Sequence, residues 1–272
     1  MDRNKAKRKK WLAALKIIIL VYCIIGILLF YLQDHLLFHP EPLDKGQSYA
    51  FSQPFRELNI PYSAGSNINV IQFVSDSIPK GVVLYFHGNR DNIARYAPLS
   101  SQFTKNGYEI WMIDYPGFGK STGPFTEAAL YDWALTFYKL ARARYSPDSI
   151  IIYGKSLGTG MATQLASVRD CKHLILETPF YSLPSVVGFW LPLHPVKHLI
   201  HYKFPNGQYL QKVTAPVTIF TGTDDLTIPL RNSQRLQPSL KTGDEFIVVE
   251  GGSHNDLFKF KTYTQKIDLL LN

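Results

Sequence analysis

Cysteine is scarce in this sequence. The 272 residues include two cysteines, Cys23 and Cys171, and neither belongs to a C-x-x-C pair. Cys23 lies inside an apolar segment and Cys171 lies deep in the globular part of the chain, so we expect no disulfide bond between them. The sequence therefore excludes a disulfide framework, and it contains no pattern of zinc ligands. It also lacks an internal repeat or a low-complexity tract beyond residue 53.

The positive charge is unevenly spread. The net charge is +8, and the first ten residues contain six basic side chains and one acidic side chain. Nucleic-acid binding is a poor explanation for this cluster, because residues 11–32 follow it directly and are apolar apart from Lys16. A segment of this length spans a bilayer as a helix, and aromatic residues lie near both of its ends. The basic residues are Arg3, Lys5, Lys7, Arg8, Lys9 and Lys10.

A cleaved signal peptide is the alternative interpretation of the apolar segment. No small-x-small site precedes Asp34, and Tyr22 before Cys23 does not suit a lipoprotein cleavage site. We therefore expect an uncleaved signal-anchor in a single-pass membrane protein. The positive-inside rule places its N-terminus in the cytoplasm and the remainder on the extracytoplasmic side, which is the periplasm in a bacterium. The predicted units are a basic cytoplasmic tail at 1–10, the transmembrane helix at 11–32, a linker at 33–54 and one globular domain at 55–272.

The globular domain alternates between strand-like and helix-like runs. Its first two strands form a hairpin, and later apolar runs alternate with amphipathic ones, so we predict a mostly parallel sheet with helices on both faces. Thr126 is placed to cap the clearest helix. The eight predicted strands are 55–60, 68–74, 82–86, 108–113, 150–153, 174–176, 217–220 and 246–249. The predicted helices are 93–105, 125–144, 161–168, 230–236 and 257–271.

One of these strands, 150–153, ends in a sharp turn. The turn reads Gly154-Lys155-Ser156-Leu157-Gly158, and a helix-compatible run follows it. A serine at the apex of so tight a turn has a strained backbone, and glycines two residues away allow other backbone to approach. The hydroxyl would then stand above the sheet at a helix N-terminus. Taken alone, the pentapeptide fits an ordinary strand-to-helix turn equally well.

Polar residues follow three other predicted strands. One strand ends in His87-Gly88-Asn89, another enters a loop with Asp224 and Asp225, and the last enters a glycine-rich loop with His254. The carboxyl ends of parallel strands meet at one edge of a sheet, where the chemistry of such folds gathers. With Ser156, the chain order is Ser, Asp, His.

Five motifs in this order resemble the α/β-hydrolase superfamily, and more narrowly its membrane-anchored ABHD type of serine hydrolase. They are F-H-G-N at 86–89, D-Y-P-G-F-G-K-S at 114–121, G-K-S-L-G at 154–158, G-T-D-D-L-T-I-P at 222–229 and G-G-S-H-N-D at 251–256. The resemblance extends from about Leu37 to the C-terminus. It implies an α/β-hydrolase fold, with an eight-stranded sheet and a short cap at 179–215, preceded by one transmembrane helix. Thr159 departs from the pattern, because this type often has a second glycine there.

The chemistry assigns a role to each member of a catalytic triad formed by Ser156, His254 and one aspartate. A serine hydroxyl is a poor nucleophile at neutral pH, so Ser156 needs His254 as a base, and a buried carboxylate must orient the imidazole. The resemblance implies that Asp225, and not Asp224, is that carboxylate. We expect Asp256, which lies too near His254 in the chain for this role, to cap the last helix.

The resemblance also implies an oxyanion hole. Two backbone N–H groups are required, and they would come from Leu157, after the nucleophile, and from Asn89, after His-Gly. His87 would shape the loop, and Asp114 would be structural. Neither would act as a base.

Aromatic residues are the candidates for the substrate pocket. Tyr115 and Phe118 follow a strand end, where they either line the pocket or pack in the core. Phe189 and Trp190 lie in the cap region, which is either a buried helix pair or an apolar lid over an acyl chain. In the linker, the apolar run at 36–38 either rests on the membrane or packs on the domain. Three histidines in the cap, His194, His198 and His201, lack accompanying carboxylates, so we predict no metal site.

The sequence therefore predicts a membrane-anchored serine hydrolase of carboxylic esters or thioesters, with lipid-like acyl substrates favoured. No cofactor, metal or nucleic acid is expected. An aminopeptidase-like amide hydrolase is the alternative within the same chemistry. A catalytically silent, membrane-tethered binding module is the alternative outside it.

Overall fold

The computed structural model describes residues 2–75 and 77–272, and of residues 2 and 3 only the backbone. Met1 and the Arg3 side chain, which belong to the predicted basic tail, therefore lie outside the described residues.

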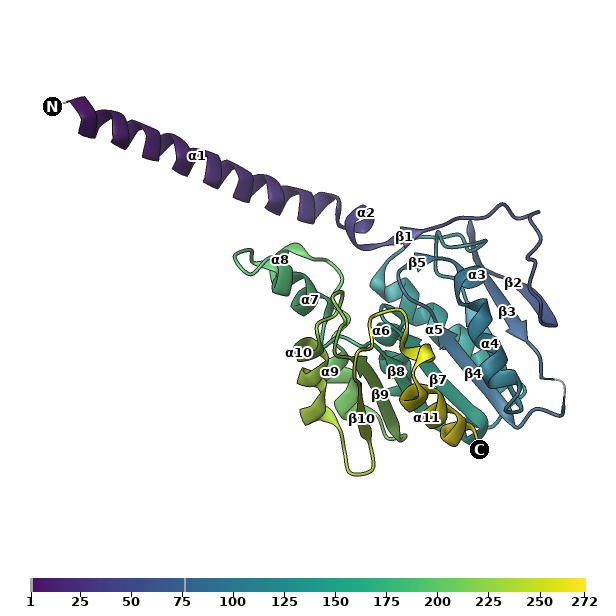
Figure 1. The fold of residues 1–272 in the computed structure, drawn as a ribbon. Coiled ribbons are helices and arrows are strands. Elements are labelled where there is room, and N and C mark those ends of the chain that lie inside the picture. Colours follow the sequence, from purple (N-terminus) through teal and green to yellow (C-terminus); the bar gives the residue numbers. More distant parts are fainter. Residues whose placement is uncertain (1, 76) are drawn as a thin grey trace.

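A single eight-stranded sheet forms the centre of the globular domain (Figure 1). Its order is β10-β9-β8-β7-β4-β6-β3-β2. The pairs β2–β3 and β3–β6 are antiparallel, and every other neighbouring pair is parallel. The predicted fold class is thus confirmed. The strands are β2 (Phe55–Ser63), β3 (Ser66–Phe73), β4 (Gly81–Phe86), β6 (Tyr108–Ile113), β7 (Ile150–Lys155), β8 (His173–Glu177), β9 (Val217–Gly222) and β10 (Glu245–Val249).

Helices cover both faces of the sheet, because the central strands are apolar on both faces. Along β4, Val82 and Leu84 belong to one hydrophobic core and Val83 and Tyr85 belong to the other. The first core also contains residues of α5 (Glu127–Arg142) and α6 (Gly158–Ala166), and the second contains residues of α4 (Ser100–Thr104) and α11 (Lys261–Leu271).

Three predicted helices are interrupted. The segment 93–105 forms α3 (Ile93–Tyr96), a 3₁₀ turn η1 (Ala97–Leu99) and α4, so the prediction of one continuous helix is wrong. Pro98 lies in η1, and proline lacks the N–H that an α-helix requires in its interior. The segment 230–236 likewise divides into α10 (Leu230–Ser233) and η4 (Gln234–Ser239), which contains Pro238. The segment 257–271 divides into η5 (Leu257–Lys259) and α11, with Phe260 extended between them. Another 3₁₀ turn, η2 (Pro147–Ser149), precedes β7.

The N-terminal helix α1 (Asp2–Tyr31) projects away from the sheet (Figure 1). Over Asn4–Tyr31 it is long and apolar enough to cross a membrane. The predicted linker contains α2 (Gln33–Leu37) and a two-residue strand, β1 (His39–Pro40), which pairs with β5 (Arg90–Asp91). Phe38 packs on the domain, with its ring 4.5 Å from that of Phe125.

The cap region lies between β8 and β9. It contains α7 (Leu183–Trp190), α8 (Val196–Leu199), α9 (Asn206–Tyr209) and η3 (Leu210–Lys212). Within the cap, α8 contacts α1. At the tip, Trp190 is 55% exposed and Leu193 is 83% exposed, so this part of the cap is not a buried helix pair.

Candidate active site

Ser156 occupies the turn between β7 and α6. Its backbone has φ of 50°, a left-handed conformation that is costly for a residue with a side chain, and its N–H donates to the Glu177 carbonyl at 2.9 Å. Glycines at both ends of the turn permit this geometry. A Cβ on Gly154 would lie 2.7 Å from the Ala162 Cβ, and one on Gly158 would lie 2.0 Å from the Phe86 carbonyl oxygen.

Ser156, His254 and Asp225 form a chain of hydrogen bonds at the carboxyl edge of the sheet. The His254 Nε2 atom is 2.9 Å from the Ser156 Oγ atom, and its Nδ1 atom is 2.7 Å from the Asp225 Oδ2 atom. The other Asp225 oxygen accepts bonds from the backbone N–H groups of Thr227 and Ile228 at 2.8 and 2.7 Å. The Asp225 carboxylate is therefore fixed in position, and it orients the imidazole toward the hydroxyl.

The two other acidic candidates face elsewhere. Asp224 is exposed, and its carboxylate accepts a bond from the Thr223 hydroxyl at 2.9 Å. Asp256 accepts from the Ser253 N–H at 2.7 Å, and this bond tightens the loop that carries His254. The expectation that Asp256 caps the last helix is wrong, because α11 begins after Phe260.

Asn89 and Leu157 both line the cavity at Ser156. The Asn89 side-chain amide donates to the Leu37 carbonyl at 2.6 Å, so it is turned toward α2. Asn89 follows Gly88, where an added Cβ would lie 3.7 Å from the Ser156 Cβ. Leu157 directly precedes α6, whose N-terminal dipole favours negative charge.

The structure places Tyr115 and Phe118 behind this site and not in it. Both are fully buried and pack against His87, and the Tyr115 hydroxyl donates to the His87 carbonyl at 2.7 Å. The His87 Nε2 atom lies 3.2 Å from the Asp114 carboxylate, which also accepts the Ile93 N–H at 3.0 Å. These side chains support the loop that carries Asn89.

Two cavities meet at Ser156. The first, of about 350 Å³, is lined by α1, α2, the cap and the Thr227–Ile228 loop, and it includes Trp190. The second, of about 220 Å³, is polar. Both cavities also include Asn89 and Thr227, so they share part of their lining at Ser156. The polar cavity is lined by Gly88, Asn89, Arg90, Arg95, Tyr96, Lys155, Ser156, Thr227, His254 and Asn255.

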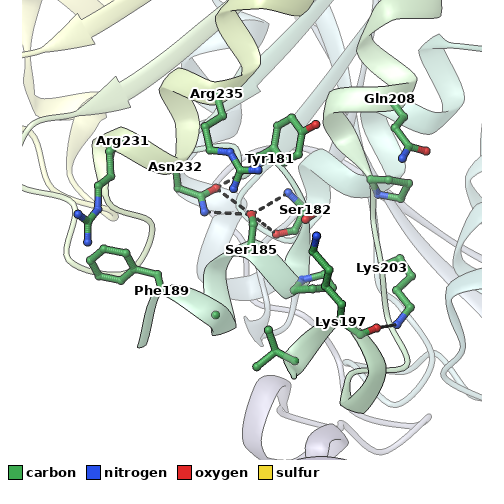
Figure 2. A pocket seen from close by; sticks show the side chains of 14 residues that line it. Tyr181, Ser182, Ser185, Phe189, Lys197, Lys203, Gln208, Arg231, Asn232 and Arg235 are labelled. Atoms are coloured by element: carbon green, nitrogen blue, oxygen red, sulfur yellow. Dashed lines mark hydrogen bonds between the residues drawn. The ribbon is translucent and has the colours of Figure 1, made fainter. Parts of the chain in front are cut away.

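Phe189 lies on the other face of α7, in a separate cavity of about 920 Å³ (Figure 2). The Arg231 guanidinium is 4.0 Å from the centre of its ring. Four cationic side chains surround this cavity, Lys197, Lys203, Arg231 and Arg235, and no residue of the Ser156 triad lines it. Phe189 thus lines a cavity that excludes the nucleophile, whereas its neighbour Trp190 lines the first cavity at Ser156.

Sequence reasoning missed the supports below the turn. The Lys155 ammonium pairs with the buried Glu177 carboxylate, to which the Tyr153 hydroxyl donates at 2.5 Å. The Thr159 hydroxyl donates to the Ser156 carbonyl at 2.6 Å and accepts from the Asn206 amide of α9 at 3.1 Å. The threonine therefore ties the cap to the turn. The sequence shows a lysine beside the serine, but it does not show that this lysine pairs with Glu177, which lies 22 residues further along the chain.

The sheet order and the serine turn define an α/β-hydrolase, and this chain belongs to the α/β-hydrolase superfamily. The family model described as "Serine aminopeptidase, S33" matches residues 77–207, which include Ser156. Within the superfamily the chain is of the ABHD type. It is 30% identical over 192 residues to mouse alpha/beta hydrolase domain-containing protein 17C, and 31% identical over 195 residues to the human 17B protein.

These alignments cover 68% and 69% of this chain, and 58% and 65% of the relatives, respectively. The chain thus matches less than two thirds of the length of either relative. Among solved structures, a Pyrococcus furiosus esterase has a TM-score of 0.67 at 16% identity and covers 86% of this chain and 97% of its own. A Paleococcus ferrophilus monoacylglycerol lipase has a TM-score of 0.57 at 20% identity and covers 75% and 98%.

Proposed function

We propose that this protein is a serine hydrolase that cleaves carboxylic esters or thioesters through an acyl-enzyme on Ser156. The observation that carries the proposal is the continuous chain of bonds from Ser156 through His254 to Asp225. A hydroxyl bonded to an imidazole, with a buried carboxylate behind it, is the arrangement that activates serine as a nucleophile.

The reaction follows from this geometry. As the Ser156 Oγ atom attacks the acyl carbon, the His254 Nε2 atom takes its proton, and Asp225 stabilises the imidazolium. The backbone N–H groups of Asn89 and Leu157 stabilise the oxyanion. His254 then protonates the leaving alcohol or thiol as its bond to the acyl carbon breaks. Water, deprotonated by the same imidazole, attacks the acyl-enzyme, and release of the acid restores the serine.

The two cavities at Ser156 favour an ester with an apolar acyl chain and a polar leaving group. Leucine, valine and aromatic side chains dominate the first cavity, and arginine, lysine, tyrosine and asparagine line the second. No Asp or Glu is among the residues that line either cavity, so neither offers a carboxylate to bind the free amine of an aminopeptidase substrate. This composition favours esters over the amide alternative.

The experiment that tests the activity compares Ser156→Ala with Ser146→Ala, an exposed serine on a distant loop. Wild type and Ser146→Ala are expected to label with a fluorophosphonate and to hydrolyse p-nitrophenyl butyrate. Ser156→Ala should remain folded, lose labelling and lose about 10⁴ to 10⁶ in kcat. If wild-type protein neither labels nor turns over the ester, the chain is a silent binding module and the proposal fails.

We also propose that α1 anchors the protein, with its N-terminus in the cytoplasm and the hydrolase domain on the extracytoplasmic side. Six basic residues precede the apolar span, and they resist translocation. In spheroplasts of a bacterial host, external protease should digest the hydrolase domain. Full protection of the domain, with digestion only after lysis, would indicate the opposite orientation, with the domain in the cytoplasm.

A further inference from the structure

The C-terminal half of α1 is docked on the cap. The rings of Tyr22 and His194 stack at 4.3 Å, and the Tyr22 hydroxyl donates to the Leu193 carbonyl at 3.1 Å. Further along, the Gln33 side chain accepts from the His201 N–H at 2.7 Å and donates to the Leu199 carbonyl at 3.3 Å. The cap segment 193–201 therefore runs beside the chain from Tyr22 in α1 to Gln33 in α2, and Figure 1 shows α8 near the end of α1.

This docking fixes how deep the cap lies relative to the apolar span. Tyr22 precedes the last residue of α1, Tyr31, by nine residues, about 13 Å along a helix axis. A helix tilt of 40° still leaves about 10 Å of depth. Half of a bilayer's hydrocarbon core is about 15 Å thick. If Tyr31 marks the membrane surface, the loop beside Tyr22 lies below that surface.

The tip of the cap has the composition that such a position requires. We define the cap tip as residues 190–195, Trp-Leu-Pro-Leu-His-Pro, which contain no Asp, Glu, Lys or Arg. Trp190 and Leu193 are 55% and 83% exposed. The histidine of the tip, His194, has its Nε2 atom 3.1 Å from the Tyr22 carbonyl. Exposed apolar groups of this kind mark a membrane or protein contact.

The same two elements enclose the apolar cavity at Ser156. Leu29 is 6% exposed although it belongs to α1, and it lines the cavity together with Leu36 and Leu37 of α2. The cap supplies the facing wall, which includes Trp190 and Leu191. In contrast, none of the described residues of α1 or α2 lines the polar cavity. The apolar cavity is thus walled by the anchor, and the polar cavity is not.

We propose that the acyl chain of a bilayer lipid enters the apolar cavity sideways, between α1 and the cap tip, while its polar part stays in the polar cavity. Leu29 then helps to select the chain, so the anchor is part of the substrate site. This proposal rests on the proposed hydrolase activity and names its substrate class as membrane-resident acyl esters.

The first test uses neighbouring residues of α1 in the full-length protein, reconstituted in phosphatidylcholine vesicles. Leu29→Trp fills the cavity, and Leu28→Trp, at a residue that is 41% exposed, is the matched control. The measured quantity is the ratio of palmitoyl-ester to butyryl-ester turnover, normalised to the sites that fluorophosphonate labels, so that partial unfolding does not mimic the effect. Leu29→Trp should lower this ratio about tenfold or more, because steric changes of this size in an apolar pocket have such effects.

The control and a second variant keep the test decisive. Leu28→Trp should leave the ratio within about twofold of wild type, and Leu29→Ala, which enlarges the cavity, should not lower it. An unchanged ratio in Leu29→Trp, with butyryl turnover present, overturns lateral access and leaves the triad standing. Absence of any turnover in wild type overturns the proposed hydrolase itself.

The second test measures the depth of the cap tip. In a Trp11→Phe background the other tryptophans are Trp190 and the buried Trp111 and Trp133. Lipids brominated in their acyl chains should quench Trp190, and aqueous iodide should not, with Trp190→Phe as the blank. Strong iodide quenching without quenching by brominated lipid would place the tip in water and overturn the proposal.

Discussion

The His254 Nδ1 atom lies 2.7 Å from the Asp225 carboxylate, whereas the adjacent Asp224 carboxylate is bound to the Thr223 hydroxyl. Asp225 is 3% exposed and accepts two further backbone bonds. Two consecutive acidic residues therefore have different environments, and only one of them can hold the imidazole.

Asp225→Asn is expected to lower kcat for p-nitrophenyl butyrate by about 10³ to 10⁴, because an amide at this position favours the wrong imidazole tautomer. Asp224→Asn makes the same chemical change next to it and should stay within about twofold of wild type. Steady-state kinetics on both purified variants make the comparison. A larger loss in Asp224→Asn would assign the orienting role to that residue instead.

Local pattern was sufficient to place the elements that carry the site. Gly154 is required by its contacts with α6, and Gly158 by its contact with the end of β4, so the pentapeptide marks the turn in any sequence that folds this way. The apolar runs that precede Asn89 and Asp225 are buried strands, the run that precedes His254 is a partly buried edge strand, and the carboxyl ends of all three share one edge of the sheet. Strand order was therefore enough to predict that these residues approach one another.

Contacts between distant segments were not predictable in this way. Tyr22 and His194 are 172 residues apart, and neither apolar periodicity nor motif spacing links them. The cavity wall at Leu29 depends on this docking, so the sequence indicated a membrane helix but not its part in the pocket. The choice between pocket and core for Phe118 was open for a related reason. A loop near a strand end can turn its aromatic ring inward, and only tertiary packing decides the direction.

The buried pair of Lys155 and Glu177 predicts a stability effect. Their side chains are nearly inaccessible, and the Tyr153 and Tyr263 hydroxyls donate to the same carboxylate at 2.5 and 3.3 Å. Burial raises the pKa of both tyrosines well above the usual value, so they stay protonated donors at alkaline pH. Glu177→Gln leaves the ammonium without its counter-charge and is expected to destabilise the protein by about 3 to 5 kcal/mol.

The double variant Lys155→Met/Glu177→Gln is the control, because it removes both charges together. It should recover a large part of that stability, since an apolar side chain in place of a buried charge is often nearly neutral. Urea unfolding midpoints in detergent give the comparison. A double variant less stable than the Glu177→Gln variant would show that the lysine is stabilised by groups other than this carboxylate.

The last prediction concerns pH, at the end of the sheet away from Ser156. His173 begins β8, and its Nε2 atom lies 2.9 Å from the Thr218 hydroxyl. Burial lowers the pKa of His173 to about 4, so between pH 6.5 and 4 the unfolded chain binds a proton that the folded chain does not. Stability should therefore fall as pH falls through this window, by at most about 3 kcal/mol from this residue.

His173→Gln removes this titration while keeping a group able to hydrogen-bond to Thr218. Between pH 7.5 and 4.5, the wild-type protein should lose more unfolding free energy than His173→Gln does, because only the wild type has the imidazole to protonate on unfolding. The exposed His198, changed to Gln, is the matched control and should follow the wild-type curve. Urea unfolding of the three proteins at the two pH values gives the six free energies. Equal losses in wild type and His173→Gln would mean that His173 remains accessible to protons in the folded protein, and that other groups cause the acid sensitivity.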